Sequence, residues 1–278
     1  MNASLSNVDT QDTRVLYSGL SGWHQGQLYQ FAARVLLIHI GKTGGGTVRR
    51  MLWAANVTND QVHVHPVPRA AIASHSRIVI CVRDPVDRFI SAYNHAIIMN
   101  DAWAVELAKC YDVNRFALQF AYRRINPSLQ SARGACAKLD PVVDAWAATV
   151  NYSRYGHSPV DGCFHVGGCI QDLAGRSKDV FVVRTEMMDT DSQSLLEWLN
   201  AKHVDTIHNK DNSAATTSTQ ITTQLKPFAR EALEVALVDE YQLVNRVLRL
   251  SSNAPLSAYC VKHAEVEGLL HCSSYSTL

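Results

Sequence analysis

The segment "RVLLIHIGKTGGGTVRRML", Arg34 to Leu52, constrains the fold of this chain more than any other stretch. The largely apolar run Val35 to Ile40 predicts a strand buried on both faces, as in a parallel sheet. A glycine cluster and then a helix-forming segment follow this run. A strand, a glycine-rich turn and a helix in this order point backbone N–H groups and the positive end of the helix at an anion. The segment therefore predicts an α/β fold with a local anion site.

Further strands and helices alternate along the chain. The apolar runs Arg77–Val82 and Asp179–Arg184 predict buried strands, and the alternating stretch Gln61–Pro68 predicts a short strand that enters a loop. The stretches Asp191–Lys202 and Lys226–Leu250 predict helices, the second a single long one. We expect a three-layer α/β domain over residues 31–250, with a mainly parallel central sheet flanked by helices. Residues 1–30 are expected to form an N-terminal arm, and residues 251–278 a C-terminal tail packed on the domain.

A helix with a well-marked start is expected over Pro85–Ile98. Its apolar residues recur at helical spacing and form one stripe. Asp84 can serve as the N-cap, proline suits the first helical position, and Asp87 adds a negative charge to the first turn. These signals place the start of the helix directly after the second buried strand.

The overall charge and the hydropathy exclude several classes of partner. The formal net charge is +1, so no whole-molecule field attracts nucleic acid or an anionic membrane. No run approaches the roughly 20 apolar residues that span a bilayer. The N-terminus is polar and acidic, unlike a signal or transit peptide. We expect a soluble protein, cytoplasmic as written, or from the Golgi lumen if an anchor has been removed.

The chain has seven cysteines, an odd number for a disulfide framework. Cys163, His165 and Cys169 lie close together in "GCFHVGGC", where a metal site or a local disulfide can be imagined. Because a CxxC pair is missing, we expect no metal there.

The glycine loop does not follow the ATP-binding pattern GxxxxGK[ST], since its lysine precedes the glycines. "GKTGGGT" instead resembles the first motif, PKTGGT(T/S), of sulfotransferases that use 3′-phosphoadenosine 5′-phosphosulfate (PAPS). That family has a second motif, RDPxxRxxSxY, and "RDPVDRFISAY", Arg83 to Tyr93, matches it in full. Looser similarity extends over roughly Arg34 to Leu250. The resemblance implies a P-loop NTPase-like sulfotransferase fold, with PAPS as cosubstrate, the desulfated nucleotide PAP as product, and no required metal.

The resemblance also implies a set of donor-binding residues. Arg83 and Ser91 correspond to residues that bind the 3′-phosphate, and charge-assisted hydrogen bonds suit arginine to that task. The alternative is that Arg83 merely pairs with Asp87. Gly41 stands where the family usually has proline, and Gly46 where threonine is common. The residues implied for the 5′-phosphosulfate are Lys42, Thr43, Gly44, Gly45, Gly46 and Thr47, and those implied for the lid segment "HNKDNS" are Asn209 and Ser213.

Catalysis of sulfuryl transfer needs a cation near the leaving oxygen and a base for the acceptor's proton. Lys42 is the expected cation. The expected base is His65 in "VHVHP", with His63 supporting it, because the two histidines are two apart and face the same side of an extended segment. Uronosyl 2-O-sulfotransferases of carbohydrates carry a similar HxH between the two motifs. Two surface histidines beside a proline turn are the alternative, and His95 and Glu186 are reserve candidates.

We expect the acceptor to be a hydroxyl-bearing carbohydrate or small molecule, with the carbohydrate preferred. Six basic residues lie between Lys109 and Lys138 against one acid, Asp112, and form either a site for an anionic acceptor or a solvated helix face. Trp103, Trp146 and Tyr155 are candidates to stack on a sugar ring, or are core residues. A sulfotransferase of a small hydroxylated metabolite, an ATP-dependent kinase and a non-catalytic nucleotide-binding protein are the alternatives in function.

Overall fold

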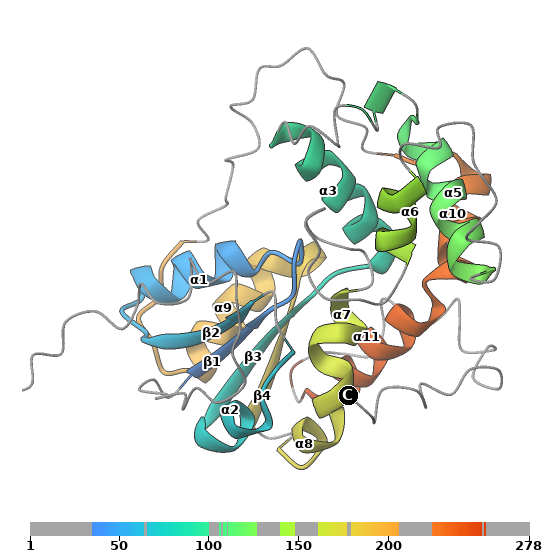
Figure 1. The fold of residues 1–278 in the computed structure, drawn as a ribbon. Coiled ribbons are helices and arrows are strands. Elements are labelled where there is room, and N and C mark those ends of the chain that lie inside the picture. Colours follow the sequence, from blue (N-terminus) through green and yellow to red (C-terminus); the bar gives the residue numbers. More distant parts are fainter. Residues whose placement is uncertain are drawn as a thin grey trace, which may run out of the picture. The chain divides into compact units, whose positions relative to one another are not determined.

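The central sheet contains four parallel strands in the order β2-β1-β3-β4 (Figure 1). The strands are β1 (Val35–His39), β2 (Asn59–His63), β3 (Arg77–Val82) and β4 (Val180–Arg184). A computed structural model describes residues 35–63, 66–99, 106, 108–109, 111–126, 140–147, 161–176, 179–205, 224–251 and 253, all within the unit Phe31–Leu278. The expected three-layer α/β architecture with a parallel sheet is confirmed.

Helices cover both faces of the sheet (Figure 1). One face packs against α1 (Gly45–Ala54) and α9 (Met188–Trp198), in a core that includes Leu37 and Leu195. The other face packs against α2 (Arg69–Ser74), α8 (Ile170–Ala174) and α11 (Val238–Leu250), and a short helix α7 (Asp161–Val166) contacts α11. Alternate residues of β1 enter opposite cores, which explains why the strand is apolar along almost its whole length.

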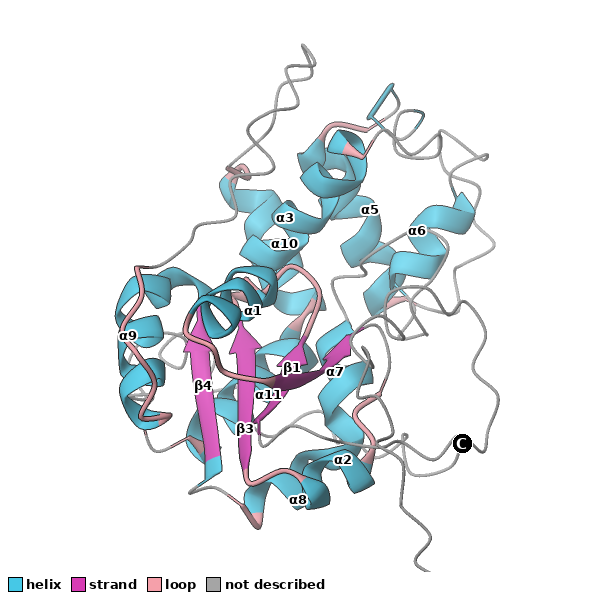
Figure 2. Cartoon of the chain, turned by 90° about the vertical axis from the view of Figure 1, so that its left-hand side faces the viewer, coloured by secondary structure: helices cyan, strands magenta, loops and turns pink. Residues whose placement is uncertain are grey.

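A third, all-helical core lies at the end of the sheet to which the strands point (Figure 2). It is formed by α3 (Pro85–Ile98), α5 (Val113–Ile125), α6 (Asp140–Ala147) and α10 (Pro227–Ala236). Trp146 is fully buried there against Phe89 and Phe116. Trp146 is therefore a core residue rather than a platform for a sugar ring, whereas Trp103 and Tyr155 lie outside the described residues.

The start of α3 follows the expected capping pattern. The Asp84 carboxylate accepts hydrogen bonds from the backbone N–H groups of Val86 and Asp87, at 2.9 and 3.0 Å. Such a cap stabilises a helix by about 1 kcal/mol. Asp84 also accepts a 3.0 Å hydrogen bond from the Tyr241 hydroxyl, so the cap ties α3 to α11.

The single long helix expected over Lys226–Leu250 is wrong, because the chain forms two helices that meet at Leu237. Its φ and ψ angles of −106° and 20° are not helical. The physical reason lies in the cores on either side. Leu233 of α10 packs in the all-helical core, whereas Val244 of α11 packs on the sheet. A straight helix presents its apolar stripe in one direction, and the break lets this segment serve two cores.

The basic residues of the Lys109–Lys138 segment are engaged in internal contacts where the structure describes them. Arg123 is fully buried and forms a 3.2 Å ion pair with Asp144. Arg124 pairs with Asp239. The basic surface available to an anionic acceptor is thus reduced, and Arg133 and Lys138 lie outside the described residues.

The described part of the chain has no helix that is long and apolar enough to cross a membrane. Within the same part, no three His, Cys, Asp or Glu side chains are arranged to hold a metal ion. Cys169 carries a free, buried thiol that donates to the Val166 carbonyl at 3.3 Å.

Candidate active site

The carboxyl ends of the four strands bring the candidate site residues to one edge of the sheet. Lys42 follows β1, His63 ends β2, Arg83 follows β3 and Glu186 follows β4. In open parallel sheets this edge is where ligands bind. The sequence separation of these residues is large, and the parallel strand order is what brings them together.

The loop after β1 has an unusual backbone at Lys42. Three non-glycine residues in the described part have positive φ: Lys42 at 65°, Asn56 at 59° and Asn200 at 53°. The two asparagines end helices, and asparagine tolerates this conformation well. Lysine does not, and residues held in sparsely populated regions cluster at functional sites. The Thr43 hydroxyl supports the loop by donating to the Ile40 carbonyl at 2.7 Å.

The N-terminus of α1 is open to an anion. Gly44 is the N-cap, with φ of 77°, and it offers no capping side chain, while the first turn contains no acidic residue. Side chains are excluded on both sides of this turn. A Cβ atom on Gly44 would lie 2.4 Å from the Met188 Cε, and one on Gly45 would lie 2.1 Å from the His39 ring. The glycines therefore permit a positive φ and close packing where the helix dipole favours negative charge.

Lys42 and Arg83 are two cations held close together. The Arg83 guanidinium donates to the Lys42 carbonyl at 3.4 Å, and its Nε is buried without a hydrogen-bond partner among the described residues. Burial, and next the charge of Arg83, lower the pKa of Lys42 to about 8. Two adjacent cations and an unsatisfied nitrogen fit an anionic ligand. Asp87 is not the partner of Arg83, because it pairs with Arg230 at 2.9 Å.

Two histidines stack beside this loop. The rings of His39 and His63 are 4.2 Å apart and inclined by 19°. His63 Nδ1 lies 2.7 Å from the His39 carbonyl oxygen, and His39 Nδ1 lies 2.7 Å from Gln61 Nε2. Arg49 of α1 donates to Gln61 Oε1 at 3.4 Å. Burial lowers the pKa of His63, opposed by its bond to the His39 carbonyl and assisted by Arg49.

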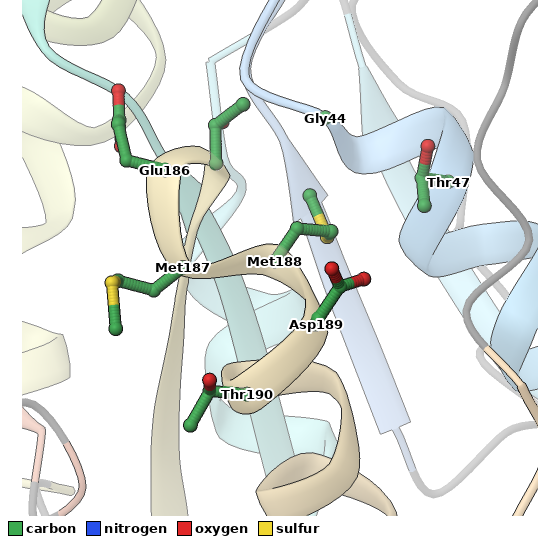
Figure 3. A pocket seen from close by; sticks show the side chains of 8 residues that line it. Gly44, Thr47, Glu186, Met187, Met188, Asp189 and Thr190 are labelled. Atoms are coloured by element: carbon green, nitrogen blue, oxygen red, sulfur yellow. The ribbon is translucent and has the colours of Figure 1, made fainter.

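A cavity of about 360 Å³ opens between the glycine loop and the start of α9 (Figure 3). Gly44 and Thr47 lie on the α1 side, and Met188 and Asp189 extend toward them from α9. Thr190 of α9 also lines the cavity. Its lining is completed by the segment between β4 and α9, which contributes Thr185, Glu186 and Met187. The cavity combines thioethers, hydroxyls and carboxylates next to the helix N-terminus.

Residues 34–146 match the model of the sulfotransferase family. This segment contains the glycine loop, the histidine stack and Arg83, and it supports sulfuryl transfer in general. Comparison with curated proteins and with solved structures gave no match.

The remaining predicted residues fall in different places. Ser91 is half-buried in α3, and His95 lies in the last turn of that helix. Glu186 accepts a 3.0 Å hydrogen bond from the Asp84 backbone N–H, and burial is the main reason that its pKa is raised. His65, Asn209 and Ser213 lie outside the described residues.

Sequence reasoning missed His39 and Gln61. His39 is a single polar residue in an apolar strand, which was a usable signal. Its partner could not be predicted from the sequence, because the pairing of His39 with His63 follows from the parallel register of β1 and β2.

Proposed function

We propose that this protein transfers a sulfuryl group from PAPS to an acceptor hydroxyl, with a carbohydrate as the acceptor. The observation that carries the proposal is the pair of cations at the uncapped start of α1. Within the described residues the Lys42 ammonium has no hydrogen bond or ion pair, and Arg83 has only its contact with the Lys42 carbonyl. The family match of this segment supports the same chemistry.

In this proposal the loop from Lys42 to Thr47 binds the 5′-phosphosulfate, and Arg83 with Ser91 binds the 3′-phosphate. The open N–H groups of α1 supply donors for the first anion. The buried Nε of Arg83 is a further donor that needs an acceptor. Asn209 and Ser213 remain proposed donor contacts from the lid segment.

The cavity in Figure 3 is proposed to receive the nucleoside end of the donor. The carboxylates of Glu186 and Asp189 can accept hydrogen bonds from the N–H groups of a purine. The thioether of Met188 can pack against an aromatic ring. These groups lie next to Thr47 and Gly44, so a nucleotide can span from the cavity to the loop.

The proposed chemistry uses Lys42 and the His63–His65 pair. The oxygen of the acceptor hydroxyl forms a bond to sulfur while the bond between sulfur and the phosphate oxygen breaks. Lys42 stabilises the charge that develops on that leaving oxygen. A neutral histidine accepts the hydroxyl proton, and His63 can do so through Nε2 because its Nδ1 carries the proton given to the His39 carbonyl. His65 was the preferred base from the sequence and stays a candidate.

A binding experiment tests the donor. Isothermal titration with adenosine 3′,5′-bisphosphate, ATP, and ATP with magnesium should show tightest binding of the bisphosphate. Arg83→Ala should weaken that binding, whereas Arg69→Ala, at a side chain that is 77% exposed, serves as the matched control. Preference for ATP with magnesium would overturn the proposed donor and favour a kinase.

A transfer experiment tests the reaction and the acceptor. Sulfate labelled with ³⁵S in the donor should appear in members of a panel of glycans, and Lys42→Ala should abolish transfer while Lys202→Ala, at an exposed lysine, should not. Transfer to small alcohols alone would replace the carbohydrate with a small metabolite. Binding of the bisphosphate without transfer to any acceptor would favour a non-catalytic nucleotide-binding protein.

A further inference from the structure

The His39–His63 stack joins two strands whose residues are far apart in the sequence. His39 ends β1 and His63 ends β2, and the two are direct partners in the parallel register. Gln61 lies on the same face of β2 as His63, since residues two apart in a strand face the same side. The three side chains therefore form one layer beneath the start of α1.

The hydrogen bonds of this layer determine which ring nitrogens carry protons. Arginine can only donate, so the contact of Arg49 with Gln61 Oε1 turns the amide nitrogen of Gln61 toward His39. That nitrogen donates to His39 Nδ1 at 2.7 Å, which leaves the proton of neutral His39 on Nε2. A carbonyl oxygen can only accept, so His63 carries its proton on Nδ1. In the neutral ring the lone pair of His63 is then on Nε2.

The surroundings keep both rings neutral near pH 7. Burial is the main cause of the lowered pKa of His39, followed by the charges of His63, Arg49, His165 and Lys42. The pKa of His63 is also lowered, mainly by burial, with Arg49 acting in the same direction. A neutral His39 imposes no charge repulsion on a proton arriving at its stacking partner.

We propose that His39 and Gln61 are positioning residues for His63. The His39 carbonyl keeps the His63 ring in its Nδ1–H form, with Nε2 as the basic nitrogen, and the stacked His39 ring, held by Gln61, fixes the orientation of the His63 ring. The inference rests on the proposed role of His63 as a proton acceptor. When the acceptor hydroxyl attacks, its proton moves to Nε2 and the electron pair of the O–H bond remains on the oxygen that bonds to sulfur. The resulting imidazolium keeps its hydrogen bond from Nδ1 to the His39 carbonyl.

The alternative is that the stack merely fills space at the ends of β1 and β2. Gly45 is compatible with that alternative, since its backbone packs directly on the His39 ring. The two possibilities differ in what they predict for kcat and for the pH profile of the His39 and Gln61 variants. A space-filling role changes stability but leaves both of these unchanged.

The kinetic test separates stacking from hydrogen bonding. His39→Phe keeps a flat ring, and His39→Ala removes it. We expect His39→Ala to lower kcat by about tenfold or more with little change in the KM for the donor, and His39→Phe to recover most of kcat, because ring orientation governs proton transfer. His203→Ala, at an exposed histidine, is the control.

Gln61→Glu tests the hydrogen-bond relay. A carboxylate beside His39 Nδ1 requires a proton on that nitrogen and stabilises the charged ring. The acid limb of the pH–kcat profile should therefore move, whereas Gln171→Glu, at an exposed glutamine of α8, should leave it in place.

The tautomer can be observed directly by ¹⁵N NMR of the histidine side chains near pH 7.5, with the His63 signal assigned by its loss in His63→Asn. We expect a protonated Nδ1 and an unprotonated Nε2. The opposite tautomer, or unchanged kcat and acid limb in His39→Ala, His39→Phe and Gln61→Glu, would overturn the inference. If His63→Asn itself keeps full activity, the proposed role of His63 as base fails instead.

Discussion

The basic limb of the pH profile should report Lys42. Its pKa is lowered to about 8, first by burial and then by Arg83. With that value, the charged fraction of Lys42 in the free enzyme is about 90% near pH 7 and about 10% near pH 9. Since the uncharged amine cannot stabilise the leaving oxygen, kcat/KM for the donor should fall about tenfold per pH unit above about pH 8.

The assay is the initial rate of ³⁵S transfer at sub-saturating donor between about pH 5 and pH 10. The pKa of His63 lies below its ordinary value, so the acid limb should have its midpoint below about pH 6.5. Bound anions favour the charged lysine, and the basic limb of kcat should therefore lie at higher pH than that of kcat/KM.

Lys42→Arg supplies the decisive comparison, because a guanidinium stays charged throughout this range. The variant should lose the basic limb even if its rate is lower at every pH, whereas Lys202→Arg should retain the wild-type profile. A basic limb that persists in Lys42→Arg, or that has its midpoint near pH 10 in the wild type, would refute the reasoning about Lys42.

Substitutions at three positions test residues that support the site. Gly45→Ala would place a Cβ atom 2.1 Å from the His39 ring, and it should lower kcat together with the melting temperature seen by calorimetry. Asp191→Ala removes the partner of buried Arg184, to which it bonds at 2.6 and 2.9 Å, and should cost about 3–5 kcal/mol in urea unfolding. Asp84→Ala should cost about 1–2 kcal/mol and Asp84→Asn clearly less, since asparagine still caps the helix; equal losses for both would count against the capping role.

The sequence predicts well those elements whose own residues are enough to identify them, without knowledge of the elements they pack against. The runs of β1, β3 and β4 are apolar because both faces of the sheet are covered, and that pattern is visible without knowing any partner. Asp84 likewise marks the start of α3 locally. In contrast, β2 reads "NDQVH", and all five of its residues are only half-buried, so its place at the sheet edge comes from pairing with β1.

The residues of the candidate site fall into the same two groups, those that can be predicted locally and those that depend on long-range pairing. Lys42 and Arg83 can be predicted from the sequence, because each belongs to a short motif of neighbouring residues. The partnership of His39 with His63 depends on strand register, a long-range property that no local pattern encodes. The break at Leu237 was missed because the helical periodicity continues through it, while the change of core that causes it is a tertiary property.

The difference in ion pairing between Arg88 and Arg83 supports an anionic ligand at Arg83. Arg88, five residues further along the chain, is buried and forms a 3.1 Å ion pair with Glu240 across α3 and α11. A buried charge without a partner costs several kcal/mol, and the ion pair with Glu240 avoids this cost at Arg88. The half-buried Arg83 and Lys42 have no acidic partner among the described residues. An anion that satisfies both cations therefore relieves an existing penalty as it binds. Because ligand binding stabilises the folded state by about 2.7 kcal/mol at a hundred times Kd, a bisphosphate should raise the melting temperature more than either monophosphate at equal concentration.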